Sequence, residues 1–391
     1  MKKRLKQYSS FLFIVILISV IFFILPFYSS AQKKKISLKD SLDHTFDVSD
    51  WLIDAHGFIP VPNIITEPSL GNFGLAIVPI FLKPRTPYID SIGDKRKINP
   101  VSPDITGAAL FYTANNTFGA IAFRAGTWKK QRVKYRLATG YADINMDFYR
   151  TLAIVGEQAF EFNFKTFLFY GYGLKQLKNP KWRIGLQDLL LFTKVGYGGQ
   201  LPDFVQPKDI KSTVSSLGPV IEFDNRDNVF TPNKGLKARI DTYWSNDVIG
   251  SDYNYYRINY FINAYKPLLP NLTGGIRLDG QQAFDDTPFY LLPYIDMRGI
   301  PINRYQGQAD ILTEAELRWD FKKRWSIMAY GGTGKAFDNW NDFGSADWAY
   351  SYGTGFRYLM ARKFGLRMGV DIARGPEQWA YYIIFGNSWF K

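Results

Sequence analysis

Residues 235–245 read Gly-Leu-Lys-Ala-Arg-Ile-Asp-Thr-Tyr-Trp-Ser, and apolar and charged side chains alternate along them. In an extended strand, Leu236 and Ile240 project from one face, while Lys237, Arg239 and Asp241 project from the other. Segments with the same two-residue period recur between residue 71 and the end of the chain, among them 132–141, 254–264, 272–281 and 313–321. The period predicts an all-β fold whose strands have one apolar and one polar face.

The composition narrows the class of protein. Of the 391 residues 17% are aromatic, yet only 46% are hydrophobic, which is too polar for a bundle of membrane-spanning helices. The chain has no Cys, which excludes disulfides, thiol catalysis and thiolate metal sites. Its two His residues, His44 and His56, lie in the first sixth of the chain, so catalysis by a His in the main body is excluded as well.

The first residues have the composition of an export signal. Basic residues precede an apolar run over residues 11–27, and Ser29-Ser30-Ala31 follows it. This order predicts a signal peptide cleaved after Ala31; the alternative is an uncleaved anchor helix. We therefore divide the chain into a signal peptide at 1–31, a short periplasmic segment at 32–70 and a barrel at 71–391.

Strands with alternating apolar and polar residues occur in two kinds of fold, the soluble β-sandwich and the closed membrane barrel. Here Tyr and Trp gather on the apolar faces near strand ends, and full charges occupy successive positions of the opposite faces, which suits a wet lumen. Strands in lipid must close into a barrel because every backbone polar group needs a partner. The sequence therefore favours a transmembrane antiparallel β-barrel of about sixteen strands over a sandwich.

Turn signals give the strand boundaries of this barrel. The predicted starts lie near residues 72, 105, 117, 131, 145, 160, 181, 212, 235, 252, 270, 308, 324, 348, 364 and 378. The connections 82–106 and 283–308 are long and odd-numbered in this count, which assigns both to the outer face of the membrane. The alternation slips between Lys181 and Val195, where Asp188 precedes three Leu residues, and we expect a β-bulge there.

Residues 222–235 read Glu-Phe-Asp-Asn-Arg-Asp-Asn-Val-Phe-Thr-Pro-Asn-Lys-Gly. Asp224, Arg226 and Asp227 resemble the Asp-x-Arg-Asp strand end of the BamA/TamA-type bacterial surface antigen superfamily, and Pro232 and Gly235 resemble the periplasmic turn that follows it. We expect the acidic and basic side chains to satisfy each other near the barrel wall. The resemblance covers about residues 58–390 and implies a barrel in the outer membrane of a Gram-negative bacterium.

A second motif, Met-Arg-Gly-Ile-Pro at 297–301, resembles the Val-Arg-Gly-aromatic tip of the family's sixth extracellular loop. The resemblance implies that this loop folds into the lumen and that Arg298, next to Gly299, is latched by carboxylates of the wall. Glu314 and Glu316 of the following strand are the expected partners. The alternative is an ordinary loop arginine in solvent.

The last two strands carry the third point of resemblance. Arg367 and Asp371 resemble positions of the family's penultimate strand and share one face. The final strand, expected over 381–390, ends in Trp389 and Phe390. These two residues resemble the aromatic signal by which the assembly machinery recognises its clients.

The family pattern is incomplete at three positions. Ile300 replaces the usual aromatic residue, and Lys391 follows the aromatic end. Gly332, within Tyr-Gly-Gly-Thr-Gly at 330–334, stands where the next strand of the family has an acidic residue. These departures leave the exact partner of Arg298 open.

The segment ahead of the barrel points to a subgroup. Family members that insert or secrete proteins carry periplasmic POTRA modules there, and residues 32–70 are too few to fold as one. The chain resembles the small group of barrels without these modules, and its Pro-rich residues 57–68 are similar to their lead-in. Residues 40–53 are expected either to form a short helix that plugs or braces the periplasmic mouth, or to remain disordered.

The family inserts or secretes proteins, or moves lipids, at the outer membrane. The resemblance therefore implies a barrel whose first and last strands pair weakly and open towards lipid. A passive diffusion channel and a structural barrel that recruits partners are the alternatives. We expect no enzyme activity, since known lipases and proteases of this architecture rely on a His.

The expected partners are outer-membrane lipids and other outer-membrane or periplasmic proteins, with a homodimer among the alternatives. We expect no cofactor and no metal, because Asp285-Asp286 forms no complete calcium loop. We also expect no nucleic acid: the net charge is +13, but no basic block follows Lys33-Lys34-Lys35.

Overall fold

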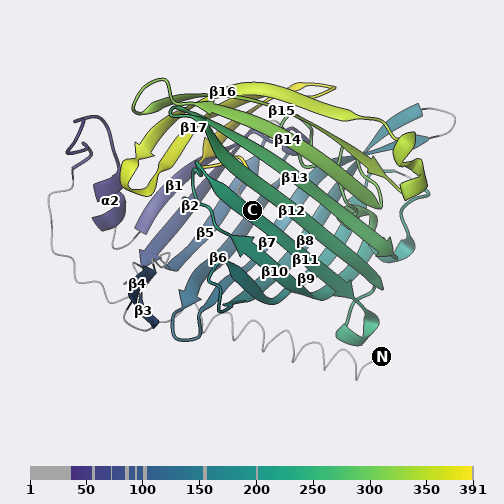
Figure 1. Cartoon of the computed structure of the whole chain (residues 1–391). Helices are drawn as coiled ribbons and strands as arrows, with labels where there is room; N and C mark the ends of the chain where they lie inside the picture. The colour runs from purple at the N-terminus through teal and green to yellow at the C-terminus, as the bar shows by residue number, and fades with distance from the viewer. Residues whose placement is uncertain are drawn as a thin grey trace. The chain divides into compact units, whose positions relative to one another are not determined.

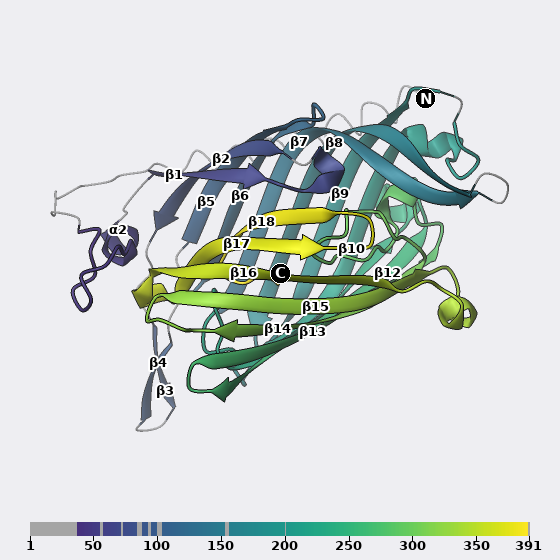
Figure 2. The ribbon, with the colours of Figure 1, turned by 90° about the horizontal axis from the view of Figure 1, so that it is seen from above.

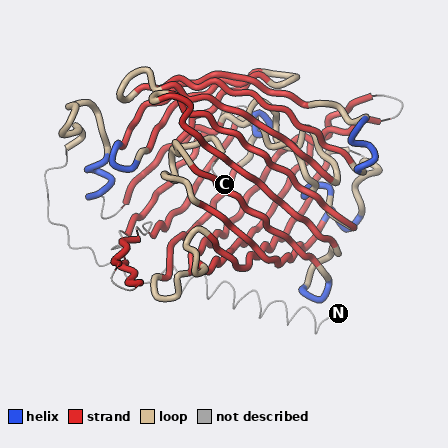
Figure 3. The backbone as a smooth tube through the Cα atoms, viewed as in Figure 1, coloured by secondary structure: helices blue, strands red, loops and turns tan. Residues whose placement is uncertain are grey.

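The computed structural model describes residues 37–54, 58–71, 73–83, 88–92, 95–99, 104–152, 156–199 and 201–389. The predicted signal peptide, His56 and Phe390 lie outside these ranges. None of the helices within them is long and apolar enough to cross a membrane. The helices are α2 (Ser49–Asp54), η1 (Pro68–Leu70), η2 (Pro207–Ile210), η3 (Asp247–Ile249), η4 (Phe289–Leu291), η5 (Trp340–Gly344) and η6 (Arg362–Phe364), and Figure 3 shows them at the ends of the strands.

Sixteen antiparallel strands form one sheet, which curls into a nearly closed barrel with tilted strands (Figures 1 and 2). This architecture confirms the predicted all-β barrel and its strand number. The strands of the sheet are β1 (Phe58–Ile65), β2 (Gly74–Lys83), β5 (Asp104–Thr113), β6 (Phe118–Trp128), β7 (Val133–Leu152), β8 (Gly156–Gln176), β9 (Trp182–Tyr197), β10 (Lys211–Asp224), β11 (Gly235–Ser245), β12 (Tyr255–Leu269), β13 (Leu272–Asp285), β14 (Ala309–Trp319), β15 (Trp325–Phe337), β16 (Ala349–Ala361), β17 (Leu366–Arg374) and β18 (Trp379–Phe385).

The barrel has two ends. The connections after β2, β6, β8, β10, β12, β14 and β16 lie at the end that we call proximal, and the remaining connections lie at the distal end. A separate hairpin of β3 (Tyr88–Ile92) and β4 (Lys95–Asn99) belongs to the proximal connection between β2 and β5.

The exterior face of the barrel is apolar and remains exposed. Ile240 and Ile276, in the middle of their strands, are 52% and 60% exposed. Exposed aromatic side chains flank this band, with Tyr112, Tyr256, Phe284, Tyr350 and Trp379 towards the distal end and Trp128, Trp182, Trp319, Trp325 and Phe356 towards the proximal end. An apolar band between two aromatic girdles is typical of a barrel in a bilayer.

Two errors in the predicted boundaries offset each other. The sheet begins at Phe58 rather than near residue 72, because Pro60 and Pro62 lie in β1, an edge strand in which Pro is tolerated. The strand predicted to start near residue 145 is the distal half of β7. The polar side chains there do not mark a turn, since the Nδ2 of Asn163 on β8 donates to Asp143 and Asn145 at 2.5 Å and 2.8 Å.

Two further expectations are wrong. Because β1 precedes β2, the connection 82–106 is even-numbered and lies at the proximal end, whereas the connection after β13 is odd-numbered as predicted. β9 contains no bulge, since it pairs in continuous register with β8 and β10. Asp188 lies on its exterior face, while Leu189 and Leu191 pack inside against a cluster around Tyr253. Around residues 189–191 both faces of β9 carry Leu, and Asp188 stands on the exterior face, which hid the alternation.

Candidate functional site

The seam of the barrel lies between β1 and β18. These strands end the sheet on either side and approach each other (Figure 2), but among the described residues no ladder pairs them. β1 has 8 residues and β18 has 7, which makes them short for a barrel wall. The wall is therefore weakest along this line.

The chain leaves the wall after β18, which corrects the expected final strand over 381–390. Gly386 has a φ of +80°, and its N–H donates to the carbonyl oxygen of Arg367 at 2.7 Å. A side chain at this position would come within 2.8 Å of the carbonyl oxygen of Phe230, so the turn requires Gly. The C-terminal tail, residues 386–389, consequently points into the barrel.

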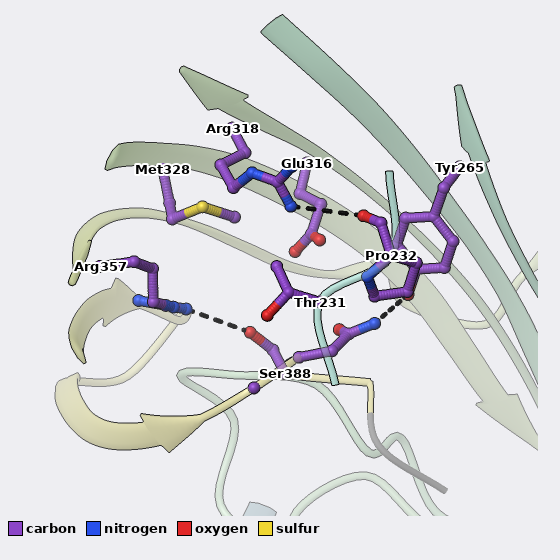
Figure 4. Close-up of a pocket in the computed structure, with 10 residues that line it drawn as sticks. Thr231, Pro232, Tyr265, Glu316, Arg318, Met328, Arg357 and Ser388 are labelled. Carbon is purple, nitrogen blue, oxygen red and sulfur yellow. Dashed lines mark hydrogen bonds between the residues drawn. The ribbon is translucent and has the colours of Figure 1, made fainter. Parts of the chain in front are cut away.

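Trp389 is buried inside the barrel at 2% exposure instead of ending an exterior strand. Its ring packs on Tyr265 with 5.8 Å between centroids, and its carbonyl oxygen accepts from Asn263 Nδ2 at 3.2 Å. The neighbouring cavity is lined by the tail and by proximal residues of several strands, and Figure 4 shows Ser388 and Arg357 facing each other across it. The tail thus contacts β12 as well as β17, the strand beside its own.

Arg298 of loop 286–308, the connection after β13, is held by acidic residues of the interior face. Its Nη1 donates to Asp371 Oδ2 at 2.8 Å and to Ser388 Oγ at 2.9 Å. Its Nη2 lies 3.6 Å from Glu314 Oε1 and 3.5 Å from Glu316 Oε2. The two predicted partners are therefore close, but the shortest contacts go to Asp371 and to the C-terminal tail.

The carboxylates around Arg298 are shared with other guanidinium groups. Asp371 accepts from Arg357 at 2.5 Å and 2.9 Å, and Glu314 accepts from Arg277 at 2.7 Å. All of these side chains come from the interior faces of β13, β14, β16 and β17, so four strands meet the loop at one point. The role of Asp371 was not foreseen, because sequence spacing placed it only beside Arg367. Arg367 itself bonds Asp320 and Ser326 near the proximal end.

The missing acidic residue at position 332 has a structural explanation. A side chain on Gly332 would come within 2.6 Å of Glu314 Cγ and 2.7 Å of Met297 Sδ. The absence of a side chain thus leaves room for the loop and for the carboxylate of the adjacent strand. Tyr330, two residues earlier, lies with its ring 3.5 Å from the Arg298 guanidinium carbon, a cation–π contact.

Loop 286–308 also contacts the β18 side of the seam. The N–H of Gly299 donates to the hydroxyl of Tyr382 on β18 at 2.9 Å. Gly299 has a φ of +87°, and a side chain there would come within 2.9 Å of the Gly375 nitrogen. The glycine that follows Arg298 is therefore required by both conformation and close backbone approach.

The same loop contacts the β1 side of the seam. The N–H of Ile302 donates to Glu67 Oε1 at 3.1 Å, and Glu67 belongs to the connection between β1 and β2. Burial raises the pKa of this carboxyl. Farther along the loop, Arg304 lies 3.1 Å from Glu377 in the connection between β17 and β18. Residues 299–304 therefore tie together the distal connections on both sides of the seam.

The strand-turn motif at residues 224–235 is held together by its own side chains. The Nε and Nη2 of Arg226 donate to both carboxyl oxygens of Asp224, at 3.0 Å and 2.9 Å. Asp227 accepts from the backbone of the same turn, and Gly235 takes a φ of +108°. The carbonyl oxygen of Pro232 accepts from Arg318 at 3.3 Å (Figure 4). This turn therefore reaches the interior cavity beside the C-terminal tail.

A second charged group lines the interior of β7, β9, β10 and β11. Glu222, 1% exposed, lies 3.2 Å from Lys134 and 3.3 Å from Arg183, with Lys237 at 4.0 Å. The expected lumen charges are thus present, and here one carboxylate faces three cations. Within the ranges that the structure describes, no group of three or more His, Asp or Glu is arranged to hold a metal ion.

The comparisons with known proteins agree with the barrel fold. Residues 109–295 match the Omp85 superfamily domain. The barrel is similar to BamA from Haemophilus ducreyi lacking POTRA domains 1–3, with a TM-score of 0.56, 12% identity, and coverage of 84% of this chain and 69% of that chain. It is also similar to CdiB from Escherichia coli, with a TM-score of 0.55, 10% identity, and coverage of 83% and 61%, so it spans less than two thirds of CdiB. No curated protein matches the sequence.

Proposed function

Starting from an outer-membrane β-barrel of Gram-negative type that carries an Omp85 superfamily domain, we propose that the chain assists the insertion, translocation or exchange of proteins or lipids at the outer membrane. In this proposal the seam between β1 and β18 is the working part. The distal end faces outward and the proximal end faces the periplasm, following the rule that barrel loops are long outside and short inside.

The seam is the observation that carries the proposal. Every other neighbouring pair of strands in the sheet forms a ladder, whereas β1 and β18 approach without one in the described residues. Pro60 and Pro62 have no N–H to offer, so β1 cannot supply a full row of donors. Opening the wall here breaks fewer backbone hydrogen bonds than at any ladder, and an unsatisfied backbone group in lipid costs several kcal/mol.

A disulfide across the seam tests the proposal. Because the chain has no native Cys, only the introduced pair can form a disulfide within it. Ile64→Cys or Ile65→Cys is combined in turn with Cys at each residue of 379–385, and the pair that crosslinks fully is used in cells. We expect the crosslink to reproduce the effect of depletion on outer-membrane proteins or surface lipids, and reduction to reverse it. Normal profiles with a complete crosslink would exclude lateral opening. The matched control is a pair across the intact ladder at Ile240 and Tyr260.

A passive diffusion channel is the second candidate, and the charged interior around Glu222 favours it. Conductance in planar bilayers separates the two. Steady, large openings in the unmodified barrel indicate a channel, whereas small, noisy openings indicate an interior closed by loop 286–308. We propose no catalytic step for either function.

A further inference from the structure

Residues 37–54, the N-terminal cap, form a compact unit on the proximal end. Residues 38–47 make a tight hairpin with a Lys39–Phe46 bridge, and the short helix α2 follows at Ser49–Asp54. The expected helix over 40–53 is thus mostly a hairpin. Its backbone requires His44 to take a φ of +55°.

One arginine of the barrel fixes this hairpin. Arg324, in the turn between β14 and β15, places its guanidinium 2.7 Å from Asp40, 2.6 Å from Asp43 and 2.6 Å from Asp47. Three carboxylates therefore surround a side chain that is only 4% exposed. A fourth contact, between Lys363 and Asp50 at 2.6 Å, adds the turn after β16.

The cap lies against the exterior girdle of the barrel as well as its rim. The hydroxyl of Tyr358 donates to the carbonyl oxygen of Phe46 at 2.7 Å. Tyr358 shares the exterior face of β16 with Phe356, and its ring packs against Trp325 with 4.8 Å between centroids. Trp325 and Phe356 belong to the proximal aromatic girdle, so the cap continues the lipid-facing surface.

The cap exposes four large apolar side chains on a short stretch of chain. Leu42 is 74% exposed, and Leu38, Phe46 and Ile53 are between 43% and 48% exposed within 16 residues of chain. Exposed lysines lie at the same rim, at positions 39, 322 and 323. Apolar residues beside lysines are the composition of segments that lie in the interface of an anionic or zwitterionic leaflet.

We propose that the N-terminal cap is a membrane anchor, whose Leu38, Leu42 and Phe46 enter the boundary between headgroups and acyl chains of the proximal leaflet. The proposal rests on the outer-membrane placement above but does not require the seam to open. Continuity with the girdle argues for lipid as the occupant. A protein partner or a second copy of the chain would instead cover these side chains with protein.

Single-Cys variants test this directly, because the chain has no native Cys. Leu42→Cys and Phe46→Cys are spin-labelled in the full barrel, folded in nanodiscs of phosphatidylethanolamine and phosphatidylglycerol. Ser41→Cys, exposed in the same hairpin, and Lys178→Cys, exposed in a proximal turn, serve as controls. Power saturation compares collisions of each label with oxygen, which concentrates in lipid, and with a water-soluble nickel complex.

We expect oxygen collisions to dominate at positions 42 and 46, and nickel collisions to dominate at 41 and 178. Nickel dominance at all four positions would overturn the proposal, and so would shielding of 42 and 46 from both reagents, which indicates a protein cover. Heat-modifiable gel mobility confirms that each variant contains a folded barrel. The collision rates at position 42 should be the same in a seam-crosslinked barrel. The test of the anchor therefore does not depend on whether the seam opens.

Discussion

Replacing Arg298 with Met tests whether charge holds loop 286–308 in place. Met keeps most of the aliphatic bulk and removes the guanidinium, so packing changes little. The wild-type guanidinium contacts Asp371 at 2.8 Å and lies within 3.6 Å of Glu314 and Glu316. Its removal leaves three interior carboxylates without a shared cation.

The three carboxylates are not affected equally. Asp371 keeps Arg357, and Glu314 keeps Arg277. Glu316 has Arg298 as its one ion-pair partner in the part of the chain that the structure describes, so it becomes an uncompensated buried charge. Removing one partner of a buried pair costs about 3–5 kcal/mol, which shifts the equilibrium between bound and released loop by about two to three and a half powers of ten.

Conductance in planar bilayers and trypsin cleavage at Arg304 measure the release of the loop. We expect both to increase in Arg298→Met and to increase less in Arg298→Lys, which keeps the charge but not the planar fork. Adding Glu316→Gln to Arg298→Met should restore part of the wild-type behaviour, because it removes the charge left alone. Lys178→Met, in an exposed proximal turn, is the matched control for loss of one positive charge.

Two results would refute this reasoning. If Arg298→Met conducts and is cleaved like the wild type, the contacts of Arg298 do not hold the loop. If Arg298→Met releases the loop but Glu316→Gln restores nothing, the loss of charge balance at Glu316 is not the cause.

Three further predictions concern the tail and the cap. Gly386→Ala forces a positive φ on a residue whose side chain meets Phe230, so we expect the free energy of unfolding in urea to fall by about 1–3 kcal/mol. Gly344→Ala, where an added side chain meets open space, is the control. Arg324→Gln should release the cap, which a sharper spectrum of a label at Leu42 would report; an unchanged spectrum would show that Arg324 is not needed. Acid should release the cap only well below neutral pH, since the bond from Arg362 lowers the pKa of Asp40 to about 2.

The lowered pKa values of the cap carboxyls decide the pH at which acid releases the cap. The pKa of Asp43 is lowered by its bond to Arg324, and bonds from Ser49 and Arg324 outweigh burial in lowering the pKa of Asp47. A carboxyl with a lowered pKa stabilises the docked cap above its unfolded value of about 3.9 and loses that contribution as the pH falls through the lowered value. The label at Leu42 should therefore report the same state from pH 8 to pH 5 and release below about pH 4. Release near pH 6 would contradict the assignment.

The sequence predicted the wall of the barrel well because the wall depends on alternation. Lys237, Arg239 and Asp241 lie on one face of β11, and that face is interior. The prediction failed where another rule applied locally. β1 was missed since its prolines read as an extended lead-in ahead of the barrel, and β7 was cut in two since a new strand was placed near residue 145, next to Asp143 and Asn145. In the structure both polar residues bond across to β8.

The contacts of the site were less predictable, because they join residues far apart in sequence. Glu314 and Glu316 could be proposed as neighbours of Arg298, since one strand carries both, and in the structure they lie 3.6 Å and 3.5 Å from its guanidinium. Ser388 and Glu67 were not, because their approach depends on a tail that turns inward and on a loop that crosses the seam. The one sequence signal for the inward turn of the tail was Gly386 after the last strand. Glycine is too common for a single one to predict such a turn.

The position of these contacts explains how a weak seam is compatible with a stable barrel. The bonds that link the two sides, from Ile302 to Glu67 and from Arg304 to Glu377, lie in the distal connections, where water can replace a broken hydrogen bond. A ladder within the lipid has no such replacement. Because loop 286–308 holds the seam, most of the free energy of opening is spent on contacts at the rim. That free energy therefore depends on one loop. If so, Arg298→Met and the seam disulfide should act in opposite directions on any activity that requires opening.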